Sequence, residues 1–69
     1  MTNTVELEIA ILRKGLTKKE VAKYLGLSEQ GFLLKLKNST EFKASEIQAL
    51  VDLLELPDKS IFFEKYGSK

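Results

Sequence analysis

The stretch LTKKEVAKYLGLSEQGFLLKLKN, residues 16–38, contains the start and stop signals of two short helices. Thr17 and Glu20 form a capping box, in which each side chain can satisfy a free N–H group at the start of a helix. Gly26 supplies the left-handed position at which this helix ends, and Ser28 caps the next one. The stretch therefore predicts two helices joined by the tight turn LGLS.

The residues around this turn indicate how the two helices cross. Ala22 is small where the helices meet, and the glycine of the turn tolerates a sharply bent backbone. Leu27, Phe32 and Leu36 then hold the second helix against the first. This spacing is that of a helix-turn-helix, with the motif at about residues 17–38. In such a motif the second helix protrudes, and its N-terminal residues can reach base edges in the major groove.

An earlier helix is predicted at the N-terminus. Asn3 is a candidate N-cap with Glu6 three residues on, and the helix continues to Lys14 before Gly15 ends it. Its helical spacing comes from apolar residues three or four positions apart, namely Val5, Ile9 and Leu12.

A fourth helix is expected after a polar loop at residues 38–40. Ser45 and Gln48 form a second capping box, and Pro57 stops the helix. The apolar stripe of this helix consists of Ile47, Leu50, Val51 and Leu54.

A short final helix is predicted through Ile61, Phe62 and Phe63. Its aromatic residues, which include Tyr66, either close the core over the first helix or form a dimer seam. Core closure is favoured for at least one phenylalanine, because so small a chain needs every large apolar group. No segment alternates with period two, so the expected fold is all-α with five helices in a single domain over residues 1–69.

The residue composition argues against several classes of function. The 69 residues include no Cys and no His, which removes disulfides and the common zinc ligands. No phosphate-binding glycine loop is present, and the carboxylates are scattered over predicted solvent faces. We therefore expect no enzymatic activity, no cofactor and no metal. No apolar run approaches the roughly 20 residues that span a bilayer, and the N-terminus does not resemble a signal peptide, so a cytoplasmic protein is expected.

The net charge of +1 is unevenly distributed. Residues 13–43 carry eight basic and three acidic side chains, a net charge of +5, whereas residues 1–12 and 44–69 each carry −2. A basic middle section favours an anionic partner there, although a solvated helical face explains the charge equally well.

The sequence resembles the phage Cro/repressor helix-turn-helix family over roughly residues 5–63. LTKKEVAKYLGLSEQGFLLKLKN carries the resemblance, and EFKASEIQALVDLLEL is similar to the fourth helix of small phage members. The resemblance implies a compact five-helix lambda-repressor-like DNA-binding domain, with the helix-turn-helix at helices 2 and 3. It also implies double-stranded operator DNA as the partner, bound by a two-fold dimer in the cytoplasm of a bacterial host.

Rotation by about 100° per residue sorts the second helix of the motif into faces. The residues placed toward the bases are Glu29, Gln30, Leu33 and Leu34. Gln30 is the better base-contact candidate, because it can pair with adenine. Glu29 can accept from a cytosine amine, but an acid in the first turn also simply complements the helix dipole.

Phosphate contacts are expected from the start of the first motif helix and from the loop after the second. The candidates are Thr17, Lys18, Lys19, Lys37, Asn38, Ser39, Thr40 and Lys43. Family members usually place a Gln where this chain has Lys18, which can still neutralise a phosphate. Alternatively, Thr17 only caps the helix and the lysines are solvated.

Leu33 and Leu34 depart from the family pattern, which usually places polar or basic residues at one or both positions. Leu33 either tucks under the following loop or shares the outward face, and Leu34 can contact thymine methyls. Alternatively, the face binds a protein through Gln30, Gly31, Leu33, Leu34 and Lys37. Two functions therefore remain open. One is a Cro-like regulator that binds operator DNA. The other is an antirepressor that binds a partner phage repressor and alters its DNA binding, which the resemblance also implies because small phage modulator-of-repression proteins are built on such a domain.

Overall fold

Four α-helices form the framework of the computed structural model, which describes residues 1–64. They are α1 (Thr4–Arg13), α2 (Lys18–Leu25), α3 (Glu29–Leu36) and α4 (Ala44–Leu54), followed by the short 3-10 helix η1 (Ser60–Phe62). No strand occurs among residues 1–64, so the predicted all-α class is confirmed. No helix in this part of the chain is long and apolar enough to cross a membrane.

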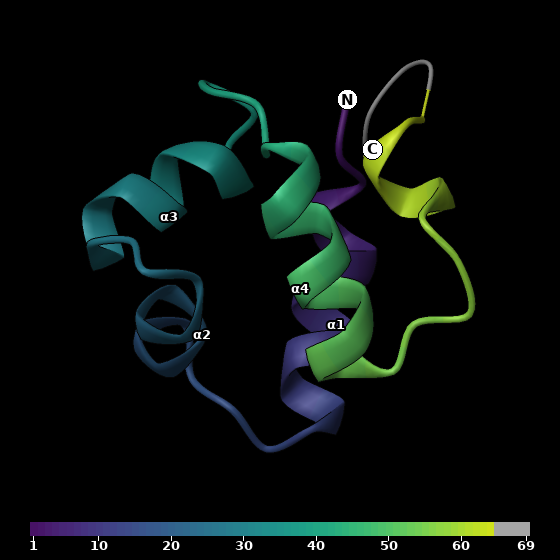
Figure 1. Ribbon diagram of the computed structural model, residues 1–69, viewed down its shortest axis with the longest axis horizontal. Helices are drawn as coiled ribbons and strands as arrows, with labels where there is room; N and C mark the ends of the chain where they lie inside the picture. The colour runs from purple at the N-terminus through teal and green to yellow at the C-terminus, as the bar shows by residue number, and fades with distance from the viewer. Residues whose placement is uncertain (65–69) are drawn as a thin grey trace.

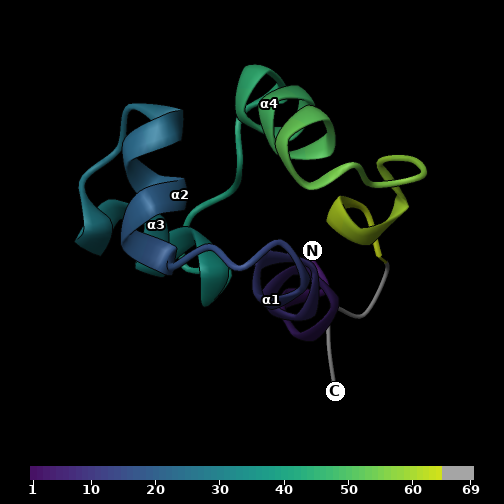
Figure 2. The same cartoon turned by 90° about the horizontal axis from the view of Figure 1, so that it is seen from below.

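The helices enclose one core from several sides. Figure 1 shows α2 and α3 together on one side of the molecule, with η1 on the other. Figure 2, turned by 90°, separates α4 from α1, which lie on opposite sides of the interior. The two ends of the described chain lie close together, because Glu64 N–H donates to the carbonyl of Met1 at 2.9 Å.

The first three helices begin where the sequence predicts. The Asn3 side chain accepts from the N–H of Glu6 at the start of α1. Thr17 and Glu20 form the reciprocal capping box of α2, with N···O distances of 2.8 and 3.1 Å. Ser28 Oγ accepts from Gly31 N–H at 3.0 Å to cap α3. These caps depend on residues only three positions apart, which explains why they are visible in the sequence.

The predicted start of α4 is wrong. The helix begins at Ala44 with Lys43 as N-cap, so Ser45 lies inside the first turn instead of capping it. Glu46 Oε1 accepts from Lys43 N–H at 2.8 Å, which is the return half of a capping box. A lysine side chain has no acceptor to complete the box. The carboxylate of Glu46 therefore fixes this helix start.

The predicted final helix is a single 3-10 turn. Asp58 Oδ1 accepts from Ser60 N–H at 2.8 Å and starts this turn. The helix does not continue through residue 64, because the Glu64 N–H bonds to Met1 instead of to a preceding carbonyl. Phe62 is buried and closes the core as predicted, whereas Phe63 is exposed. Tyr66 lies outside the described residues.

The core is a cluster of aliphatic side chains around three aromatic rings. Phe42 packs edge-on against Phe32 and Phe62, with centroid distances of 6.0 and 5.6 Å. The other buried apolar residues are Leu7, Ala10, Ile11, Val21, Ala22, Leu36, Ile47, Leu50, Leu54. The buried side of α1 therefore comes from residues other than Val5, Ile9 and Leu12, all three of which face solvent.

Candidate nucleic-acid interface

The turn between α2 and α3 sets the position of the candidate interface. Gly26 adopts a left-handed conformation with φ of 75°, which glycine reaches without a Cβ penalty. Leu27 N–H donates to the Ala22 carbonyl at 2.9 Å and closes the turn. Phe32 and Leu36, both buried, then attach one side of α3 to the core. The opposite side of α3 faces outward.

The outward face of α3 contains little charge. Glu29 and Gln30 are exposed at its N-terminal end, and Lys37 is exposed just after its last turn. Leu34 is 42% exposed, whereas Leu33 is half-buried and packs against the core. The structure thus separates the two leucines, and only Leu34 is fully part of the outward face.

Gly31 has a local structural explanation. A Cβ built at this position would lie 3.1 Å from Ser28 Oγ, the atom that caps α3. That distance is tighter than ordinary van der Waals contact, so a side chain would press on the cap. Glycine therefore leaves space for the capping hydroxyl at the first turn of α3.

Lys35 is buried instead of solvated, which the sequence analysis missed. Its ammonium donates to the Glu41 carbonyl at 2.9 Å and lies 3.0 Å from Glu46 Oε1. Lys35 follows Phe32 by three positions, and this spacing places it beside the inward side of α3. The three-residue spacing from Phe32 is therefore the sequence signal that could predict the burial of Lys35. Its charge is compensated inside the protein and is not part of the outward face.

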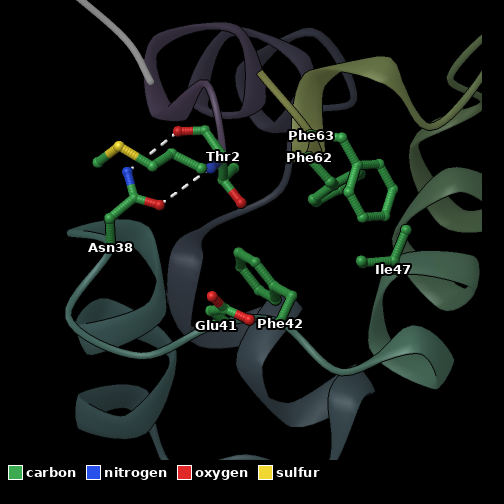
Figure 3. A pocket seen from close by; sticks show the side chains of 8 residues that line it. Thr2, Asn38, Glu41, Phe42, Ile47, Phe62 and Phe63 are labelled. Atoms are coloured by element: carbon green, nitrogen blue, oxygen red, sulfur yellow. Dashed lines mark hydrogen bonds between the residues drawn. The ribbon is translucent and has the colours of Figure 1, made fainter. Parts of the chain in front are cut away.

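Asn38 is bound within the protein. Its Oδ1 accepts from Thr2 N–H at 3.0 Å, and its Nδ2 donates to the Thr2 carbonyl at 3.1 Å. Figure 3 shows this pair beside the cavity lined by Phe42, Phe62 and other residues. The φ of Asn38 is 61°, a left-handed value that asparagine tolerates better than most residues. Both ends of its amide therefore hold the N-terminal segment against the α3–α4 loop.

The remaining phosphate candidates lie on two elements. Ser39, Thr40 and Lys43 are exposed in the α3–α4 loop or at its end. Ser39 N–H donates to the Leu34 carbonyl at 2.9 Å, so the loop starts directly beside the outward face of α3.

The other group lies at the start of α2. Thr17 is exposed and its hydroxyl caps the helix, while Lys19 is exposed. Lys18 Nζ lies 3.6 Å from Glu8 Oε1, and both side chains are nearly half-exposed. A pair this exposed contributes little and can be exchanged for a phosphate. Lys18 therefore stays a candidate phosphate ligand, with part of its charge balanced by Glu8.

No group of three or more His, Cys, Asp or Glu side chains within residues 1–64 is placed to hold a metal ion.

One family model matches residues 4–68, nearly the whole chain, and its description is a protein of unknown function, DUF739. The chain belongs to the DUF739 family. No curated protein and no solved structure matches it. The description of this family names no activity.

Proposed function

We propose that α2, the Gly26 turn and α3 form a helix-turn-helix, and that this DUF739 protein is a Cro-like transcription regulator that binds operator DNA. The observation that carries the proposal is the attachment of α3. Phe32 and Leu36 bury one side of the helix, and Gln30 is exposed near its N-terminal end. A recognition helix requires this arrangement, because its N-terminal residues contact base edges in the major groove.

In this proposal Gln30 reads the bases. Its side chain presents one acceptor and two donors, which can make two hydrogen bonds to the edge of an adenine. Leu34 lies one turn further along and can contact a thymine methyl group. Such contacts specify a sequence, whereas contacts to phosphate position the protein without specifying it.

The phosphate contacts come from both ends of the motif. Lys19 and Lys37 are exposed, and Lys43 is exposed at the end of the α3–α4 loop. Ser39 and Thr40, exposed in the same loop, can donate hydroxyl hydrogen bonds to phosphate oxygens. Action on bacterial or phage DNA would place the protein in the cytoplasm of the host cell.

The test is DNA binding by the isolated protein at two salt concentrations. Fluorescence anisotropy with overlapping duplexes from the DNA flanking the gene should identify one or a few preferred sites. Doubling the salt concentration should weaken binding roughly sixfold for every three phosphates that lysines neutralise. Binding that is weak and equal on every duplex would overturn the proposal.

A second function is favoured by the chemistry of the outward face of α3. Glu29 and Lys37 balance each other there, Lys35 is buried, and Leu34 is 42% exposed. A nearly neutral face with an apolar centre suits a protein partner better than a polyanion. The second candidate is therefore an antirepressor that binds a partner phage repressor through this face and modulates its DNA binding.

The same binding assay separates the two functions when the neighbouring repressor is added. Specific DNA binding by this protein alone would support the Cro-like regulator and would exclude an obligatory antirepressor. No specific DNA binding alone, together with a stable complex with the repressor, would support the antirepressor.

A further inference from the structure

Apolar residues line the outer side of α1 and do not pack into the core. Val5 is 48% exposed, Ile9 36% and Leu12 74%, and the three residues follow one another at helical spacing. We call them the α1 stripe. Scattered apolar residues on a surface are ordinary, but a row of three along one face of a helix needs another explanation.

The stripe continues into a hollow at the C-terminal end of α1. Leu12, Ile11 and Leu16 line this hollow together with Glu8, Thr17 and Lys18. An apolar side chain from a second molecule could enter it beside Leu12. The hollow thus extends the apolar surface beyond the last turn of α1.

Charged residues flank the stripe in a pattern that selects its partner. By helical geometry Arg13 and Glu6 lie about 80–100° around α1 from Val5 in one direction, and Glu8 lies about 60° in the other. Glu8 pairs with Lys18 at 3.6 Å. No ion pair of Glu6 or Arg13 occurs among residues 1–64. One flank therefore has an acid near the start of the helix and a base at its end.

We propose that two copies of this chain pair through their α1 stripes in an antiparallel arrangement. With the two-fold axis at Ile9, this residue packs against the partner's Ile9, and Val5 packs against the partner's Leu12. The same register places Glu6 beside the partner's Arg13, and symmetry makes this contact twice. A parallel pair would instead place the acidic N-terminal turns together. Charge complementarity on the Glu6–Arg13 flank therefore favours a second copy in the antiparallel register. On the other flank Glu8 would lie near the partner's Glu8, and Lys18, 3.6 Å from Glu8 in each copy, offsets this repulsion.

The small size of the α1 stripe sets the expected affinity of the dimer. A helix of 10 residues is about 15 Å long, so two such helices bury less area than a standard interface. We expect a weak dimer with a Kd of about 10–500 μM. This inference does not rest on the proposed function, because Val5, Ile9 and Leu12 all belong to α1, although the hollow beside Leu12 shares Thr17 and Lys18 with the start of α2.

The first test is sedimentation equilibrium of the full chain up to about 1 mM. The Leu12→Glu variant should weaken dimerisation at least about tenfold, because each dimer would lose two buried leucines. Phe63→Glu is the matched control, since Phe63 is 67% exposed on another element, and it should leave the Kd unchanged. Circular dichroism verifies that both variants fold. A monomer at all concentrations, or a dimer lost in Phe63→Glu but not in Leu12→Glu, would overturn the proposal.

A second test examines the register. The chain has no cysteine, so a single Ile9→Cys variant can form only an intermolecular disulfide. At the two-fold axis the two Cys side chains would face each other, and the disulfide dimer should form readily under mild oxidation. Val5→Cys should not link to itself, because the partner's Val5 would lie about 12 Å along the helix. A mixture of Val5→Cys and Leu12→Cys should form the mixed dimer. Efficient self-linking of Val5→Cys, with none for Ile9→Cys, would contradict the antiparallel register.

Discussion

Lys35 Nζ and Glu46 Oε1 lie 3.0 Å apart, and the two side chains are only 11% and 9% exposed. Lys35 belongs to the last turn of α3, and Glu46 belongs to the first turn of α4. The ammonium also donates to the Glu41 carbonyl and lies 5.9 Å from the centre of the Phe42 ring. This ion pair therefore fixes the two ends of the α3–α4 loop to each other, and with them the C-terminal end of α3.

Replacing one partner of this pair should destabilise the fold strongly. In Lys35→Met the carboxylate of Glu46 would lose its counter-ion while it stays buried. The cost of an unpaired buried charge is about 3 kcal/mol or more. Urea unfolding at pH 7 measures it as a lower midpoint with an unchanged slope.

The double variant Lys35→Met/Glu46→Leu provides the control. It removes both charges, so it should recover part of the loss, although Lys43 N–H then lacks its acceptor. A cost of less than about 0.5 kcal/mol for Lys35→Met alone would mean that the pair behaves as an exposed ion pair, which contradicts its burial.

The same carboxylate predicts how stability depends on pH. Burial by itself would raise the pKa of Glu46, but the Lys43 N–H and the Lys35 ammonium outweigh it and hold the pKa below the usual 4.5. The folded protein therefore binds this proton less readily than the unfolded chain does. The contribution is fully present above about pH 4.5 and is lost as the pH falls through the lowered pKa.

Urea unfolding between pH 7 and pH 3 tests this dependence against the Glu46→Gln variant. The wild-type advantage should shrink as the solution becomes acidic. Glu55 beside Lys14 and Asp58 beside Ser60 also have lowered pKa values, but they are present in both proteins and cancel in the comparison. A difference that stays constant over this range would assign the pH dependence to other groups.

Asn38 allows a prediction that separates side-chain bonding from backbone strain. Asn38→Ala loses both hydrogen bonds to Thr2 and leaves a φ of 61° to a residue that tolerates it less well than asparagine, so it should cost about 2–3 kcal/mol. Asn38→Gly loses the same bonds but tolerates the left-handed backbone, so it should cost roughly 1 kcal/mol less. Urea unfolding gives the difference, and faster hydrogen exchange of the Thr2 amide should accompany both changes. Equal losses in the two variants would show that the backbone conformation contributes nothing.

The parts of the fold that the sequence predicts are those decided locally. The caps at Asn3, Thr17 and Ser28 each bond to a residue three positions away, and the inward spacing of Phe32 and Leu36 follows from one helical turn. Such signals require no knowledge of the rest of the chain. They are sufficient for the starts of α1, α2 and α3 and for the direction in which α3 faces.

The parts that the sequence did not predict depend on distant partners. Asn38 binds Thr2 across 36 positions, and no local pattern identifies that contact. Ser45 is a residue type that often caps helices. In the structure Glu46 bonds instead to the Lys35 ammonium and the Lys43 N–H, so Lys43 becomes the N-cap and the helix begins at Ala44. The spacing of Val5, Ile9 and Leu12 correctly predicts a helix but does not show which side of it is buried. The buried side depends on which residues the other helices cover.

Leu34→Lys distinguishes the two proposed functions at the outward face of α3. Leu34 is 42% exposed and its loss should not affect folding, so the change acts on the partner. Leu34→Lys removes one contact to a thymine methyl, but the added positive charge attracts phosphate and offsets that loss, so overall DNA affinity should be unchanged or higher. The same charge should weaken binding to a partner repressor at least about tenfold, because it replaces a buried apolar anchor. Phe63→Lys adds an equal charge on another exposed position and serves as the control in both binding assays. Loss of DNA binding with repressor binding intact would contradict both assignments of this face.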